Sequence, residues 1–143
     1  PTIVPVGAAA GDVLQAVTIL LRSAEIPISA LLHVAGHKST TGANSSTPIL
    51  TPAITVTQDN CLIVLMVIYQ LDCTSFGAYN PNGDGAWTQR VFQSTTTGNN
   101  QSIAVYTRLQ TTAANIAASS ITISGQATAR VARTIAVALK ANT

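Results

Sequence analysis

Charged side chains are scarce in this chain of 143 residues. Only 8% of the residues are Asp, Glu, Lys or Arg, whereas about a quarter is typical of soluble domains. Disordered chains combine much charge with few apolar residues, so a hydrophobic content of 47% argues against disorder. The formal net charge is +2, and the seven basic residues form no run of the kind that marks a nucleic-acid-binding surface. We therefore expect a folded protein that binds no nucleic acid.

Cysteine and long hydrophobic runs are also nearly missing. Cys61 and Cys73 are the only cysteines, too few for a disulfide framework, so we expect both thiols to stay reduced. The longest uninterrupted apolar run has nine residues, far short of the roughly 20 that a membrane-spanning helix needs. The start of the chain has neither the basic nor the long apolar region of a signal peptide, so we expect no leader and no membrane association.

That nine-residue run, Cys61–Tyr69, is the strongest structural signal that the sequence does contain. Val and Ile occupy four of its nine positions, and their β-branched side chains favour a strand over a helix. A strand that is apolar on both faces must be covered on both faces. The run therefore predicts a central strand, and the twenty threonines of the chain fit the same β-rich composition.

Shorter segments around this run alternate between apolar and polar residues and are separated by Gly, Asn, Asp and Pro. Such a series predicts an all-β fold, an antiparallel β-sandwich of jelly-roll-like type with about eight or nine strands. We predict loops over residues 36–48 and 74–86, and a short helical turn within residues 111–118. The segments predicted as strands, besides the central run, comprise residues 13–21, 28–34, 49–57, 87–92, 102–109, 121–124 and 131–139.

We expect residues 1–143 to form a single β-sandwich domain, because a chain of this length normally makes one domain. The N-terminal part leaves two alternatives open. Residues 1–12 contain Pro5, Gly7 and Gly11, which favour an extended N-terminal arm. Residues 13–21 are apolar except for Gln15 and Thr18, so we predict that this part pairs in the sheet.

Two short motifs resemble ligand sites without completing one. His33 and His37 have a spacing that joins metal ligands on a helix, but no Cys, Asp or Glu lies near them in the sequence to complete a site. Residues 80–85 match the first half of a calcium-binding loop, but the closing Glu would fall at Val91, so a Gly/Asn turn is the better interpretation. The five carboxylates are spread over separate predicted turns. We expect no catalytic residues, no metal and no cofactor, and hence no enzyme.

Four side chains are candidates for contact with a partner. Arg130 and Arg133 flank the start of the last predicted strand, and Arg is enriched at protein interfaces. Tyr79 lies in the predicted loop and Trp87 at its end, where aromatic rings are suited to stacking on a ligand. A core position for Trp87 and a solvated position for the arginines are the alternatives.

From about residue 49 to residue 139, the order of features resembles a family of small β-sandwich proteins found in tailed-bacteriophage virions. The segments that carry this resemblance are TQDNCLIVL at residues 57–65, GAWT at 85–88, SIAVYTRL at 102–109, ITISG at 121–125 and IAVALK at 135–140. Relatives more often have Gly-Trp-Thr, and here Ala86 intervenes between Gly85 and Trp87.

The resemblance implies a structural role on the virion surface, as in capsid decoration (cement) proteins. It implies a non-enzymatic protein that is assembled in the host cytoplasm, with the major capsid protein as its partner and a homotrimer as its oligomeric state. The alternative that it leaves open is a tail or head-fibre module that binds a host glycan or receptor.

Overall fold

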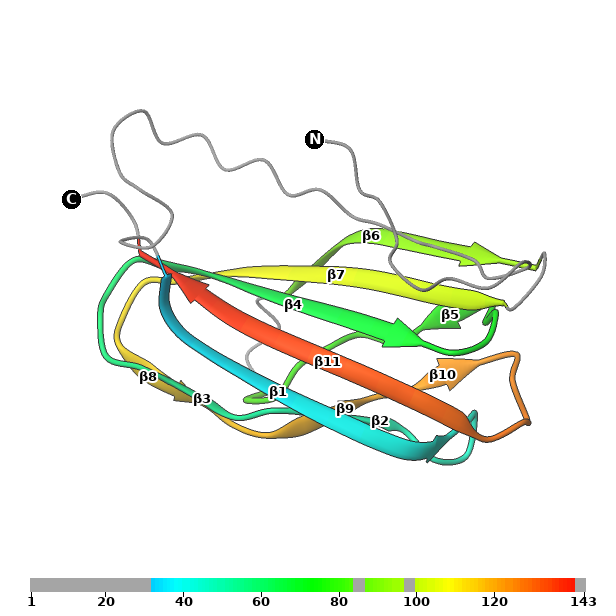
Figure 1. Cartoon of the computed structure of the whole chain (residues 1–143). Coiled ribbons are helices and arrows are strands. Elements are labelled where there is room, and N and C mark those ends of the chain that lie inside the picture. Colours follow the sequence, from blue (N-terminus) through cyan, green and yellow to red (C-terminus); the bar gives the residue numbers. More distant parts are fainter. Residues whose placement is uncertain (1–31, 84–86, 97–99, 141–143) are drawn as a thin grey trace, which may run out of the picture.

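The computed structural model describes residues 32–83, 87–96 and 100–140. These residues contain eleven strands and no helix, and all their strand pairs are antiparallel. Figure 1 shows two layers, one made of long strands and the other of short ones. The all-β, antiparallel, sandwich-like architecture predicted from the sequence is confirmed. The strand count exceeds eight or nine because six strands of the second layer have only two or three residues each.

The first layer is a five-stranded sheet in which β4 is central and β1 and β6 are the two edges. β4 is the run that the sequence marks out, and its bounds in the structure match the predicted ones. In spatial order the sheet contains β1 (Leu32–Ala43), β11 (Arg130–Leu139), β4 (Cys61–Tyr69), β7 (Gln101–Gln110) and β6 (Thr88–Thr95).

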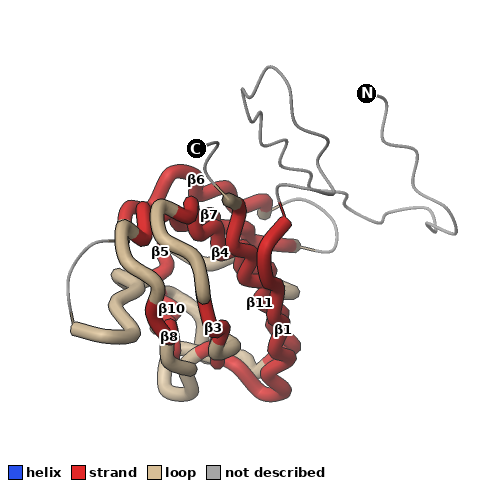
Figure 2. The backbone as a smooth tube through the Cα atoms, turned by 90° about the vertical axis from the view of Figure 1, so that its left-hand side faces the viewer, coloured by secondary structure: helices blue, strands red, loops and turns tan. Residues whose placement is uncertain are grey.

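The second layer consists of three short strand pairs that follow one another along the face of the large sheet (Figure 1). Figure 2 shows the molecule from one end of the long strands. Each pair joins a strand from the first half of the described chain to one from the second half, so the layer forms only when distant segments meet. The pairs are β2 (Ile49–Thr51) with β9 (Ser119–Ile121), β3 (Ile54–Val56) with β8 (Ala114–Ile116), and β5 (Ser75–Phe76) with β10 (Ile123–Ser124).

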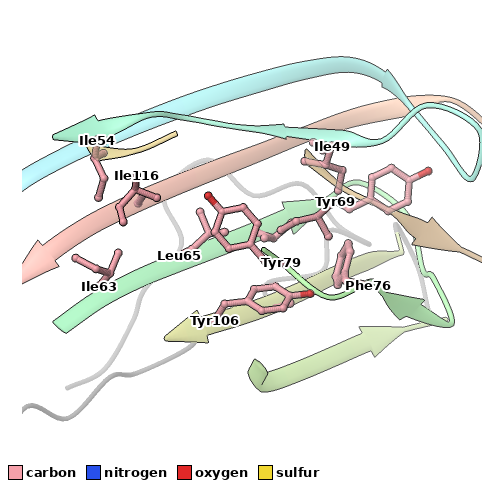
Figure 3. Packing of buried hydrophobic residues seen from close by; sticks show 14 of the residues in the cluster. Ile49, Ile54, Ile63, Leu65, Tyr69, Phe76, Tyr79, Tyr106 and Ile116 are labelled. Carbon is pink, nitrogen blue, oxygen red and sulfur yellow. The ribbon is translucent and has the colours of Figure 1, made fainter. Parts of the chain in front are cut away.

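One hydrophobic cluster fills the space between the layers (Figure 3). From β4 it receives the side chains at alternate positions, including Ile63, Leu65 and Val67, all fully buried. Two of the buried tyrosine hydroxyls in the cluster donate to backbone carbonyls, because buried polar groups are normally hydrogen-bonded. Tyr106 donates to the Gly77 carbonyl at 2.8 Å, and Tyr69 donates to the Thr128 carbonyl at 2.9 Å.

The prediction of a loop over residues 36–48 is wrong for most of that segment, because β1 extends to Ala43. Its backbone pairs with β11 from one end to the other, and this pairing does not depend on apolar side chains. At a sheet edge, polar side chains such as His37, Lys38 and Ser39 remain in solvent, so the strand carries little of the alternation by which strands are recognised.

Two further predictions are corrected in the second layer. Residues 74–86 were expected to be one loop, but they contain β5, whose Phe76 is buried in the core cluster. Within residues 111–118 the segment Ala114–Ile116 forms β8 instead of a helical turn, because its backbone pairs with β3 and buries Ile116 against the core. The predicted arm of residues 1–12 and the predicted strand of residues 13–21 lie outside the described residues.

The two faces of the large sheet are unlike one another. On β11 the residues that face the core are small, such as Ala132, Ala136 and Ala138, whereas the larger Ile135 and Val137 point to the opposite face. The alternation predicted from the sequence is therefore present in β11, but its large apolar residues lie on the outer face of the sandwich.

Gly125 and Gly42 form a matched pair of positions for testing backbone strain. Both have positive φ, +81° and +77°, a region that disfavours residues with a Cβ. A Cβ at Gly125 would also lie 2.7 Å from Cγ2 of Thr74, whereas nothing lies within 4 Å of a Cβ at Gly42. We expect Gly42→Ala to cost about 1 kcal/mol of unfolding free energy and Gly125→Ala about 2–3 kcal/mol. Urea denaturation measures both, and equal losses would contradict the steric part of this prediction.

Candidate interaction surface

Tyr79 and Trp87, two of the predicted contact residues, lie against each other. Their ring centroids are 4.6 Å apart and their planes meet at 69°, an edge-to-face arrangement. Tyr79 is only 3% exposed, and its hydroxyl accepts a hydrogen bond from Oγ1 of Thr51 at 3.3 Å. Burial raises the pKa of Tyr79, partly opposed by that hydrogen bond.

The position of Tyr79 in the core corrects its prediction as a surface contact. The loop around it carries no strand-like alternation, so the sequence offered no sign that the ring turns inward. Trp87 is partly buried and packs on the same cluster, which agrees with the core alternative for this residue. The buried ring of Tyr79 therefore presents no free face for stacking on a ligand.

Arg130 and Arg133 are both exposed, but they lie on opposite faces of β11 because side chains alternate along a strand. Arg130 donates to the carbonyl of Ala129 at 3.1 Å. Arg133 stands on the outer face beside Ile68 of β4, its register partner. The four predicted contact residues therefore do not come together in one surface.

Two cysteines and two aspartates among the described residues have structural positions. Both cysteines are free and buried, and burial raises the pKa of each thiol, which disfavours the reactive thiolate. Asp59 accepts from the backbone nitrogen of Ala113, and Asp72 accepts from the side chain of Asn100. No group of three or more His, Cys, Asp or Glu residues that suits a metal ion occurs within residues 32–83, 87–96 and 100–140.

The two short motifs also have structural explanations. His33 and His37 both lie in β1, where residues four apart are separated by about 13 Å along the strand, too far to share one metal ion. In the loop that was compared with a calcium site, the Asn82 amide oxygen accepts from the backbone nitrogen of Ala117. Gly83 has a φ of +72° and its nitrogen donates to the Asn80 carbonyl, as in a tight turn.

A hollow with a volume of about 570 Å³ lies where β1 borders β2 and the start of β9. β1 lies close to β3 beside the hollow, and Gly36 permits this, since a Cβ there would lie 2.9 Å from Cγ2 of Ile54. Leu50 is 43% exposed at the hollow. The complete lining comprises residues 36–38, 50–53 and 118–120.

The edges of this hollow are held by side-chain hydrogen bonds between the layers. Thr40 accepts from the backbone nitrogen of Leu50 at 2.8 Å, and Thr134 donates to the Leu50 carbonyl at 2.9 Å. The hydroxyl of Thr51 accepts from the nitrogen of Ser119. The lining combines one cation, Lys38, with hydroxyls and an exposed leucine, which suits a polar, weakly charged protein segment. The sequence did not reveal it, because its residues come from three distant segments.

No family model, no curated protein and no solved structure matches the chain. In the part of the chain that the structure describes, no helix has the length and hydropathy required to span a membrane. We therefore base a functional proposal on the resemblance of residues 49–139 and on the surface just described.

Proposed function

We propose that this chain is a structural, non-enzymatic protein of a tailed-phage virion that binds and stabilises the assembled capsid shell, as a decoration protein does. The observation that carries the proposal is the ordered series of segments between residues 57 and 140 that resembles this family. Its partner is then the major capsid protein, its place is the outer capsid surface, and its oligomeric state by resemblance is a homotrimer.

The spatial arrangement of those segments supports the proposal. Residues 61–65, 102–109 and 135–139 lie in β4, β7 and β11, which are three adjacent strands of the large sheet. The resemblance thus covers a continuous block of the sandwich instead of scattered pieces. Residues 121–125 overlap the ends of β9 and all of β10, in the layer opposite.

A decoration protein stabilises a shell because it binds the assembled form in preference to the free subunits. When the free decoration protein is at a concentration 100-fold above its dissociation constant, its binding stabilises each site of the assembled shell by about 2.7 kcal/mol. With a charged content of 8%, the chain offers few ion pairs, so its binding should depend on shape and hydrogen bonds and only weakly on salt. We assign the hollow between β1 and β2 to this contact.

The fibre alternative has less support. It relies on exposed aromatic rings that stack on a sugar, and Tyr79 and Trp87 instead pack on each other and on the core. Tyr69 and Tyr106 are buried as well. We therefore retain shell binding as the proposal.

The direct test compares particles that carry the protein with particles from which it has been removed. We expect stripped shells to melt at a lower temperature in calorimetry, and we expect added protein to restore the original melting temperature. An unchanged melting temperature after complete removal would refute the proposed function.

The assigned contact surface has its own prediction. Leu50→Asp places a charge in the hollow at a side chain that is already 43% exposed, so the fold should tolerate it. We expect it to weaken binding to stripped shells by tenfold or more, equivalent to about 1.4 kcal/mol. Thr55→Asp, at an exposed position of β3, is the matched control. If the control binds like the wild type and Leu50→Asp does too, the contact lies elsewhere while the proposed function stands.

A further inference from the structure

The side chain of Asn82 joins the loop that follows β5 to the edge of β8. Its amide oxygen accepts from the backbone nitrogen of Ala117 at 3.3 Å, and its amide nitrogen donates to the carbonyl of Asn115 at 3.2 Å. Backbone groups along a strand point alternately to its two sides, so groups from residues two apart lie on one edge. The Asn82 amide therefore binds the edge of β8 as the peptide group of a neighbouring strand would.

The two halves of this loop are held in different ways. The first half is anchored by the nitrogen of Gly77, which donates to the Thr122 carbonyl at 2.9 Å, and by the buried ring of Tyr79. The second half ends in an exposed turn at Asn82 and Gly83, where nothing lies within 4 Å of a Cβ at Gly83. A chemical change of the Asn82 amide would therefore act directly on how the second half is held.

Asn82 and Gly83 form the only Asn-Gly pair in the sequence. Asparagine is a thermolabile residue, and a glycine that follows it lacks the Cβ that would hinder attack of its backbone nitrogen on the side-chain amide. The nitrogen of Gly83 donates to the Asn80 carbonyl at 3.4 Å, which is a long and weak hydrogen bond. The turn thus offers little protection against this attack.

We propose that Asn82 is a site of spontaneous deamidation, and that the product releases the loop from β8. The Gly83 nitrogen gives up its proton and forms a bond to Cγ of Asn82, while the side-chain nitrogen takes up that proton and leaves as ammonia. Water then opens the resulting cyclic imide at either of its two carbonyls. The products are aspartate and isoaspartate, and the only co-reactant is water.

Neither product reproduces the contact of the Asn82 amide with β8. A carboxylate accepts hydrogen bonds but has no donor, so one oxygen can still accept from Ala117 while the other faces the Asn115 carbonyl as a second acceptor. The lost hydrogen bond and the repulsion between the two oxygens favour separation of the loop from the strand. This inference does not depend on the proposed function.

Asn44 is a matched control within the same chain. Its amide oxygen accepts from the backbone nitrogens of Ser46 and Thr47, at 2.9 and 2.8 Å. These bonds need only an acceptor, so a carboxylate at this position preserves them. The next residue is Ser45, whose Cβ hinders attack by its nitrogen. Asn44 should therefore deamidate slowly, and Asn44→Asp should leave its turn intact.

Incubation of the full chain tests the reaction itself. The protein is kept folded at mildly alkaline pH and moderate temperature, and peptide mapping by mass spectrometry follows Asn82 and Asn44 over time. We expect loss of the amide at Asn82 to be roughly tenfold or more faster, because only there is the following residue a glycine. Isoaspartate should form beside aspartate. Equal rates at the two positions, or aspartate without isoaspartate, would overturn the proposed reaction.

The variants Asn82→Asp and Asn44→Asp test the release of the loop. Both are first checked for the wild-type circular dichroism spectrum. We expect the backbone amides of residues 77–83 to exchange with deuterium about fivefold faster in Asn82→Asp, as the loss of one hydrogen bond implies. In Asn44→Asp their exchange should equal that of the wild type. Exchange in Asn82→Asp that matches the wild type would overturn the release.

Discussion

Replacing Leu65 with alanine is expected to lower the free energy of unfolding by about 2–5 kcal/mol. Leu65 is fully buried at the centre of β4, the middle strand of the sheet. It lies between Ala136 of β11 and Tyr106 of β7, its register partners on either side. Because the small Ala136 cannot expand into the vacated space, a cavity adds to the lost apolar burial. Guanidinium denaturation, followed by circular dichroism, measures the loss.

The same substitution at Leu50 is the matched control. Leu50 is largely exposed at the hollow beside β1, so Leu50→Ala should change stability by less than about 1 kcal/mol. Similar losses at the two leucines would show that β4 is not the centre of the core.

A second large effect is expected at alkaline pH. The chain has three tyrosines, Tyr69, Tyr79 and Tyr106, and all three are buried. Burial raises the pKa of each, and that of Tyr106 to about 12. A raised pKa means that the fold favours the neutral phenol. This stabilisation is complete below the unfolded pKa of about 10 and is lost as the pH rises from about 10 to 12.

We therefore expect the folded protein to show almost no tyrosinate absorbance at 295 nm near pH 10, where a free tyrosine is half ionised. The absorbance should appear at higher pH together with the loss of the folded circular dichroism spectrum. In urea, the unfolded chain should titrate normally. Substantial ionisation near pH 10 in a fully folded sample would contradict the burial of these rings.

The substitution Tyr106→Phe measures how much Tyr106 alone contributes to the loss of stability at alkaline pH. It removes a group that ionises only at high cost and also the hydrogen bond to the Gly77 carbonyl. We expect it to cost about 1 kcal/mol at neutral pH and to make stability fall less steeply between pH 10 and 12. A slope equal to that of the wild type would assign the alkaline sensitivity to the other tyrosines.

The central strand could be predicted from sequence because it contains nine adjacent apolar residues, four of them β-branched, which favour a buried strand. β1 could not be predicted in this way. This edge strand is held by backbone pairing with β11, and its polar side chains resemble those of a loop. The sequence shows that side chains alternate along β7 and β11, but it does not show which of the two alternating sets of residues faces the core. There the bulky Tyr106 of β7 lies across β4 from the alanines of β11, a fit that emerges only from the strand register.

The candidate surface was less predictable than the fold. Arg130 and Arg133, predicted as contact residues, are both exposed, but their separation by three positions places them on opposite faces of one strand. Tyr79 contacts Thr51, which is distant in the sequence, and the ring of Trp87, which the sequence alone does not place beside it. The hollow beside Leu50 is lined by three segments of the chain, and at Gly36 β1 lies so close to Ile54 that a Cβ would not fit.

The pairing of β1 with β11 has a consequence for how the molecule is made. Residues 32–43 find their sheet partner only at residues 130–139, and every strand pair of the second layer also joins segments that are far apart. On a ribosome, β1 must wait until nearly the whole domain has emerged, so folding should be completed after synthesis. Topologies dominated by such non-local pairings fold in milliseconds to seconds. During that interval β1 remains without its neighbour, and its polar side chains then protect the nascent chain against pairing with other chains.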